Sequence, residues 1–150
     1  LHGYAHPEMG HMLLPLHPSD QNFRGVCPFH GTCLEGLANG PAIEERWQIK
    51  ADRLPPDHPA WALEAHYLAL GLMNICLVLA PDRIILGGGV MNQSFLFPMI
   101  RSEFVNLLGN YLSLPQIADV ENYIVPSGLA NISGLYGGLA LARRASGDPH

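Results

Sequence analysis

The longest apolar segment of the chain lies between two proline-containing stretches. From Pro59 to Leu79 apolar residues recur on more than one face, which is typical of a long helix packed against a sheet. Pro81-Asp82 ends this helix, and the run Arg83 to Leu86 predicts a short buried strand. Ser94 to Leu112 then has the spacing of an amphipathic helix.

The remaining C-terminal part continues the alternation. Tyr123 to Val125 predicts another strand, and Ile132 to Arg144 predicts a closing helix. Because strands alternate with helices, and because the chain has 150 residues, we expect one layered α/β domain.

The N-terminal third is more broken. A short strand is expected at Gly10 to Pro15, followed by a loop from Asp20 to Thr32. Leu34 to Trp47 is helical in pattern, but Gly40-Pro41 interrupts it, so we predict a second helix beginning at Pro41. Pro55-Pro56-Asp57 is interpreted as a linker that supplies an N-cap.

Composition excludes several classes of protein. With 48% hydrophobic and 14% charged residues the chain can bury a core and is not disordered. A net charge of -5 and a single lysine, Lys50, argue against a nucleic-acid surface. The apolar run from Leu68 to Ala80 contains Asn74 and is too short to predict a membrane span.

Two features bear on location and completeness. No signal peptide is recognisable, so a reducing cytoplasm is expected. The chain starts at Leu1 without an initiator methionine and passes at once into dense motifs, so it is interpreted as a piece of a longer protein.

Metal-binding chemistry is concentrated near the N-terminus. Cys27, His30 and Cys33 lie at every third position, with a glycine between them that allows the backbone to turn. Zinc in structural sites takes four thiolate and imidazole ligands, usually a close group plus a partner from another segment. The sequence therefore predicts a zinc site of His11, Cys27, His30 and Cys33.

Other interpretations of these residues are possible. Cys27 and Cys33 could form a disulfide or be ordinary thiols, although the third cysteine, Cys76, has the surroundings of a buried thiol and nothing indicates secretion. Other histidines compete with His11 for the fourth position: His2, His6 and His17.

A glycine-rich turn suggests a second site. Three glycines, Gly87 to Gly89, follow the predicted strand and precede a helix, where the backbone could approach a nucleotide closely. Taken alone this pattern is as often a turn with no ligand. The glycines between Gly134 and Gly138 are expected to serve close helix packing, unless they also line the nucleotide cleft.

Two acids stand beside presumed zinc ligands. Glu8 and Glu35 would be fixed relative to His11 by a metal site, and carboxylates held in this way can accept hydrogen bonds from sugar hydroxyls. Three other glutamates are interpreted as solvated surface acids: Glu44, Glu45 and Glu64.

These motifs together resemble one family. The stretch His6-Pro-Glu-Met-Gly-His11, with Cys27-Pro-Phe-His-Gly-Thr-Cys-Leu-Glu-Gly36 and Gly40-Pro-Ala-Ile43, is similar to the zinc and sugar motifs of the ROK family of repressors, open reading frames and sugar kinases. The histidine in the knuckle departs from the commonest pattern and resembles the fructokinase branch. Ile85 to Met91 is similar to the family's adenosine-contacting segment.

The resemblance implies a fold and an activity. The fold would be an actin-like, ribonuclease H-like ATPase lobe with a zinc-binding loop, and this chain would be the C-terminal of two lobes. The parent would transfer phosphate from ATP, with magnesium, to a hexose, fructose above all, and would be a homodimer. Glu8, His11 and Glu35 would contact the sugar, and the nucleotide would be bordered by Pro41, Gly87, Gly88, Gly89, Val90 and Met91.

The resemblance also implies what the chain lacks. The family's phosphate-binding hairpin and catalytic aspartate do not occur here, so no catalytic residue is nominated and the chain is expected to be inactive alone. A sugar-sensing repressor with a DNA-binding part upstream is the alternative from another class. A zinc-stabilised module with no ligand is a third.

Overall fold

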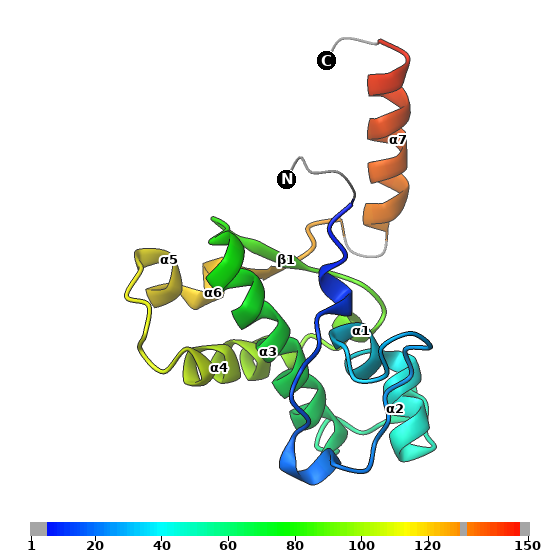
Figure 1. The fold of residues 1–150 in the computed structure, drawn as a ribbon. Coiled ribbons are helices and arrows are strands. Elements are labelled where there is room, and N and C mark those ends of the chain that lie inside the picture. Colours follow the sequence, from blue (N-terminus) through cyan, green and yellow to red (C-terminus); the bar gives the residue numbers. More distant parts are fainter. Residues whose placement is uncertain (1–5, 130–131, 148–150) are drawn as a thin grey trace.

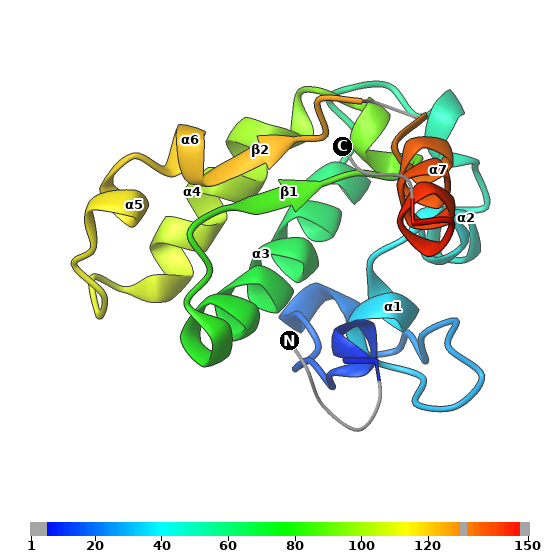
Figure 2. The same cartoon turned by 90° about the horizontal axis from the view of Figure 1, so that it is seen from above.

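A two-stranded parallel sheet and two helices form the centre of the fold. The computed structural model describes residues 6–129 and 132–147. Strands β1 (Ile84–Leu86) and β2 (Ile124–Pro126) pair in parallel, with Ile84 opposite Ile124. Helices α3 (Ala60–Leu79) and α4 (Leu96–Leu108) lie along one face of the strands (Figure 2). The predicted layered α/β arrangement is therefore confirmed.

The main core lies where α3, α4 and the strands meet. Trp61, Ile100, Phe104 and Ile124 have 0% of their surface exposed. Aromatic and branched side chains of this size supply most of the apolar area that such a small fold can bury. This cluster fixes α3, from which the N-terminal segments are positioned.

Helix α3 confirms the helix predicted from Pro59 to Leu79 and is longer than the apolar run from Leu68 to Ala80. By length and a mean hydropathy of 1.6 it has what a membrane-spanning helix needs, and 44% of its most apolar window is buried within the fold. Ten of its residues, from Ala60 to Cys76, are buried, and it packs against α4, α1 and α2. Its apolar character is thus accounted for by packing on several sides.

Short elements make up the N-terminal third. They are the 3-10 turns η1 (Met9–His11), η2 (Pro18–Asp20) and η3 (Ala51–Arg53) and the helices α1 (Leu34–Leu37) and α2 (Gly40–Trp47). The predicted break at Gly40-Pro41 is confirmed. The Asn39 side chain caps α2 by accepting a hydrogen bond from the Ala42 N–H at 2.7 Å.

A buried polar network ties the N-terminal loop to α3. The Tyr67 hydroxyl donates to Asp20 Oδ2 at 2.7 Å and accepts from the His17 backbone N–H at 3.0 Å. Asp20 Oδ2 also accepts a hydrogen bond from Arg46 Nε at 3.0 Å. Burial raises the pKa of Tyr67 to about 12, so the phenol stays a donor at neutral pH. These contacts tie the start of the loop to α3 and α2.

The C-terminal part contains shorter elements than expected. Along the chain, the segment that connects β1 to β2 contains, besides α4, the short elements η4 (Val90–Asn92), α5 (Pro115–Ala118) and α6 (Val120–Tyr123). The last helix is α7 (Ser133–Ala145). In Figure 1 α7 projects away from the rest of the fold, and none of its residues is buried.

The structure contradicts several expectations. Gly10 to Pro15 is not a strand, because η1 occupies its start and Leu13 makes only an isolated bridge to Cys33. Asp57 does not cap α3. The N–H group of Ala60, the first residue of that helix, donates instead to His58 Nδ1 at 3.2 Å. Strand β1 is not fully buried, since Ile85 is 65% exposed on the face that lacks helices.

The glycines of α7 were also misinterpreted. A Cβ added at Gly134, Gly137 or Gly138 would meet no heavy atom within 4 Å among the described residues. They therefore mediate no close helix packing with any other part of the chain that the structure describes. The apolar face of α7, with Leu135 74% exposed, has no partner within the described residues.

Candidate metal centre and ligand cleft

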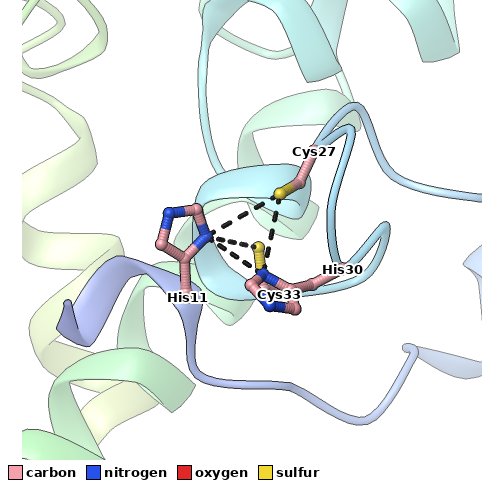
Figure 3. Close-up of side chains that lie close together, drawn as sticks. All are labelled: His11, Cys27, His30 and Cys33. Atoms are coloured by element: carbon pink, nitrogen blue, oxygen red, sulfur yellow. Dashed lines mark hydrogen bonds between the residues drawn. The ribbon is translucent and has the colours of Figure 1, made fainter.

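Four side chains from two segments converge on one point. His11 comes from η1, and Cys27, His30 and Cys33 come from the loop that leads into α1 (Figure 3). Their ligand atoms all lie within 4.8 Å of one another. The sequence-predicted metal ligands are thus brought together.

Their spacing matches a tetrahedral metal. His11 Nδ1 lies 3.7 Å from each of Cys27 Sγ and Cys33 Sγ and 3.3 Å from His30 Nδ1. A tetrahedron with zinc–sulfur bonds near 2.3 Å and zinc–nitrogen bonds near 2.0 Å has edges of about 3.3–3.8 Å. The fourth measured edge, Cys27 Sγ to His30 Nδ1, is 3.9 Å. The donor set therefore fits zinc in chemistry, and these four distances are close to the edges of a tetrahedral zinc site.

Backbone bonds hold the two segments together. The Leu34 N–H donates to the Met12 carbonyl at 2.9 Å, which fixes the segment after His11 against the start of α1. Gly31 turns the knuckle with φ +60°, a conformation that favours glycine. At Gly36 a Cβ would stand 1.8 Å from the Gly31 carbonyl oxygen. Only glycine therefore allows the knuckle to pack this closely against α1.

The protein prepares one thiol for metal binding. The His30 backbone N–H near Cys27 lowers the pKa of that thiol to about 6, against the opposite effect of burial. Burial raises the pKa of Cys33, although it lies at the start of α1. With four protein ligands in place, a bound zinc would have no open position for activating water and would act as a structural ion.

Two alternatives to this ligand set, a disulfide and a competing histidine, are not found among the described residues. Cys27, Cys33 and Cys76 are all free thiols. His6 pairs with Glu8 at 3.6 Å, and His17 Nδ1 contacts Ser19 Oγ at 2.7 Å, so neither enters the cluster. His2 lies outside the described residues.

His11 connects the metal cluster to one of the expected sugar-binding acids. Its Nδ1 faces the cluster, and its Nε2 lies 3.2 Å from Glu35 Oε2. The Glu35 side chain remains 60% exposed, so its second oxygen can reach a ligand. Glu8 approaches only through its backbone, because its carbonyl accepts from the His11 N–H while its carboxylate faces His6.

The expected nucleotide residues line one cavity of about 730 Å³. Its walls come from the start of α2, from η3, from α3 and from the turn between β1 and η4. Gly88 in that turn has φ +104°, which explains the glycine. All six nominated positions are among the lining residues: Pro41, Gly87, Gly88, Gly89, Val90 and Met91.

One lining residue was wrongly interpreted from the sequence. Glu64 is not a solvated surface acid, since it is 1% exposed and lines this cavity from α3. Burial raises its pKa to about 8, against the lowering effect of Arg46. The sequence did contain a signal for this burial. Where a helix is apolar on several faces, a glutamate on it has no solvent-exposed face to occupy. Glu44 and Glu45 are exposed, as expected.

Several known proteins are similar to this chain in sequence. The chain is 48% identical over 143 residues to a fructokinase of Pediococcus pentosaceus, which covers 95% of this chain and 48% of that protein. It is 42% identical over 141 residues to a fructokinase of Lactococcus lactis subsp. cremoris, covering 93% and 48% respectively. The chain thus spans about half the length of these curated relatives.

The solved structures agree on the fold. The ROK hexokinase of Thermus thermophilus matches with a TM-score of 0.68 and 22% identity, over 95% of this chain and 49% of that one. This likeness confirms the expected actin-like α/β fold. The model of the ROK family matches residues 1–145. The chain therefore belongs to the ROK family.

Proposed function

We propose that this chain is the C-terminal lobe of an ATP-dependent hexose kinase and that fructose is its sugar. The parent enzyme would convert ATP and fructose into ADP and fructose 6-phosphate. The names of the relatives, fructokinases at 48% and 42% identity, support this activity, and their doubled length supports a missing second lobe. They also favour a kinase over a sugar-sensing repressor or a module without a ligand.

One observation carries the proposal: a single imidazole joins the metal cluster to an exposed acid. With Nδ1 of His11 on zinc, the proton is fixed on Nε2, which then donates to Glu35 at 3.2 Å. This bond holds the Glu35 carboxylate in one orientation. A carboxylate fixed in this way can accept hydrogen bonds from adjacent hydroxyls of a hexose. Glu8, whose carboxylate faces His6, would add a further acceptor after turning toward the sugar.

The cavity beside the glycine turn is the proposed nucleotide site. Backbone N–H groups of a glycine turn after a parallel strand are suited to contact a nucleotide at the carboxyl edge of a sheet. Magnesium would accompany the phosphates of ATP. The chain supplies no recognisable catalytic base, so we propose that the base and the phosphate-binding hairpin belong to the other lobe and that this chain is inactive alone.

Two further properties follow from the proposed parent. Three free thiols suit a reducing compartment, so we place the enzyme in the cytoplasm. We also propose a homodimeric parent. The exposed apolar side chains of α7 and the open face of β1 are available either to the second lobe or to a second subunit.

The test is a kinase assay on a joined protein. The chain is fused in place of the matching half of the Pediococcus pentosaceus fructokinase, and ADP release is measured with fructose, glucose and mannose. We expect turnover fastest with fructose, and none from the 150-residue chain alone. A fusion that is folded but phosphorylates no hexose would contradict the proposal, and turnover by the chain alone would contradict its assignment as one lobe.

Variants of the fusion locate the sugar site. Glu35→Ala is expected to raise KM for fructose while KM for ATP stays unchanged. Glu45→Ala, an exposed acid on α2, is the matched control and should change neither constant. Equal KM values for fructose in the Glu35→Ala and control proteins would exclude Glu35 from the sugar site.

A further inference from the structure

Glu64 combines deep burial with a carboxyl group that makes no hydrogen bond within the described residues. Its side chain is 1% exposed, and neither carboxyl oxygen has a hydrogen-bond partner among the described residues. Buried polar groups in folded proteins are nearly always paired, and leaving one unpaired costs stability. A buried acid near the start of an apolar helix, without a hydrogen bond, therefore points to a partner that is bound from outside.

The cavity supplies the place for that partner. Glu64 and Leu68 line it from α3, opposite the glycine turn and the start of α2. Much of the remaining wall is apolar: Ala38, Pro41, Ala51, Val90 and Met91. Polar side chains also line the cavity, among them Asn39, Asn92 and Gln93. Apolar walls with a few polar groups are the usual form of a small-molecule site.

The charges around the cavity indicate which part of a nucleotide lies there. Glu44 and Asp52 line the cavity as exposed acids, and Lys50 is its only basic lining residue. Phosphate groups would be repelled by two carboxylates in this position. The base and ribose are uncharged and suit these walls better.

The protonation state of Glu64 sets the hydrogen bonds it can make. Burial raises its pKa to about 8, so at neutral pH it carries a proton. A protonated carboxyl donates from O–H and accepts at C=O. Adenine offers the complementary pair, because its N6 amino group donates beside ring nitrogens that accept.

We propose that Glu64 is a nucleotide-contacting residue: its carboxyl, whose oxygens are buried in this structure, turns into the cavity and pairs through O–H and C=O with the donor and acceptor edge of adenine. This inference rests on the proposed function, which assigns the cavity to the nucleotide. Arg46 is the competing internal partner, because its Nη2 is also buried without a hydrogen bond. If Glu64 interacted only with Arg46, its substitution would change the stability of the fold and leave ligand binding unchanged.

Two substitutions separate the hydrogen bonds from the packing. Glu64→Gln keeps one donor and one acceptor in the same shape, and Glu64→Leu keeps the volume and removes both. ADP binding to the zinc-loaded 150-residue chain is measured by calorimetry or by NMR titration. We expect Glu64→Gln to bind ADP within about twofold of the unsubstituted chain and Glu64→Leu to bind about tenfold more weakly.

Controls keep the result interpretable. Glu45→Leu makes the same chemical change on α2, outside the cavity, and should bind ADP normally. Circular dichroism and zinc content establish that each variant is folded. A ligand-side test uses the diphosphate of purine riboside, which lacks the amino group: the unsubstituted chain should bind it about tenfold more weakly than ADP, and Glu64→Leu should not distinguish the two.

The outcomes bear on different claims. A folded Glu64→Leu chain that binds ADP as tightly as the unsubstituted chain would overturn the inference and leave the proposed kinase standing. Equal binding of ADP and the purine analogue by the unsubstituted chain would overturn it as well. If the unsubstituted chain binds neither ligand at millimolar concentration, the proposed nucleotide site fails, and the inference fails with it.

Discussion

Replacing Glu64 by glutamine should stabilise the fold by an amount that grows with pH. The side chain is 1% exposed, and its pKa is raised to about 8 from an ordinary value of 4.5, chiefly by burial and against the charge of Arg46. Below pH 4.5 the acid is protonated in both the folded and the unfolded chain, so its ionisation costs nothing. Between 4.5 and about 8 only the unfolded chain loses the proton, so stability falls as pH rises.

The magnitude follows from that interval. Each pH unit above 4.5 lowers the free energy of unfolding by about 1.4 kcal/mol until the folded pKa is reached. At neutral pH the loss is therefore about 3 kcal/mol, which is large for a small fold. Glutamine does not ionise, so the Glu64→Gln chain should gain this amount relative to the original chain.

Urea unfolding, followed by circular dichroism, measures the effect at a series of pH values from about 4.5 to about 8. Zinc is kept in excess, so that loss of metal at low pH affects both chains and cancels in the difference. The difference in unfolding free energy should rise by about 3 kcal/mol across the series up to neutral pH. Glu45→Gln, at an exposed position, should show a flat difference, and a flat difference for Glu64→Gln would refute the argument.

Two other substitutions test the scaffold of the metal centre. Tyr67→Phe removes the hydroxyl that donates to Asp20 and accepts from the His17 N–H, so the unfolding free energy, measured by urea unfolding, should fall by about 1–3 kcal/mol. Tyr111→Phe, at a position that is 79% exposed, is the control and should leave it unchanged. Gly36→Ala places a Cβ 1.8 Å from a backbone oxygen of the knuckle, so zinc affinity measured by chelator competition should drop. Gly134→Ala, where a Cβ meets nothing within 4 Å, should leave that affinity unchanged, and equal affinities in the two alanine variants would contradict the packing described for the knuckle.

The parts of the fold that the sequence predicted are those with strong local signals. Pro41 ends one helical pattern and begins the next because its ring fixes φ and lacks a donor. Cys27, His30 and Cys33 are rare residue types at regular spacing, and His11 was found through its motif. These features depend on covalent geometry and ligand chemistry, which a sequence displays directly.

Other parts depend on partners that are distant in the chain. Ile85 has the pattern of a buried strand residue, but the described residues cover only one face of β1 and leave it 65% exposed. The burial of Glu64 depends on α3 being enclosed on several sides, which a lone glutamate does not reveal. Leu135 and the glycines of α7 fit a packed helix, and the described residues provide no surface for it to pack against.

The central claim is that one metal ion joins His11 to the knuckle and so orients Glu35. Zinc K-edge X-ray absorption on the purified chain tests this most directly. The account predicts one zinc per chain with two sulfur ligands at about 2.3 Å and two nitrogen ligands at about 2.0 Å. A folded chain that contains no zinc, or zinc bound without sulfur, would contradict it.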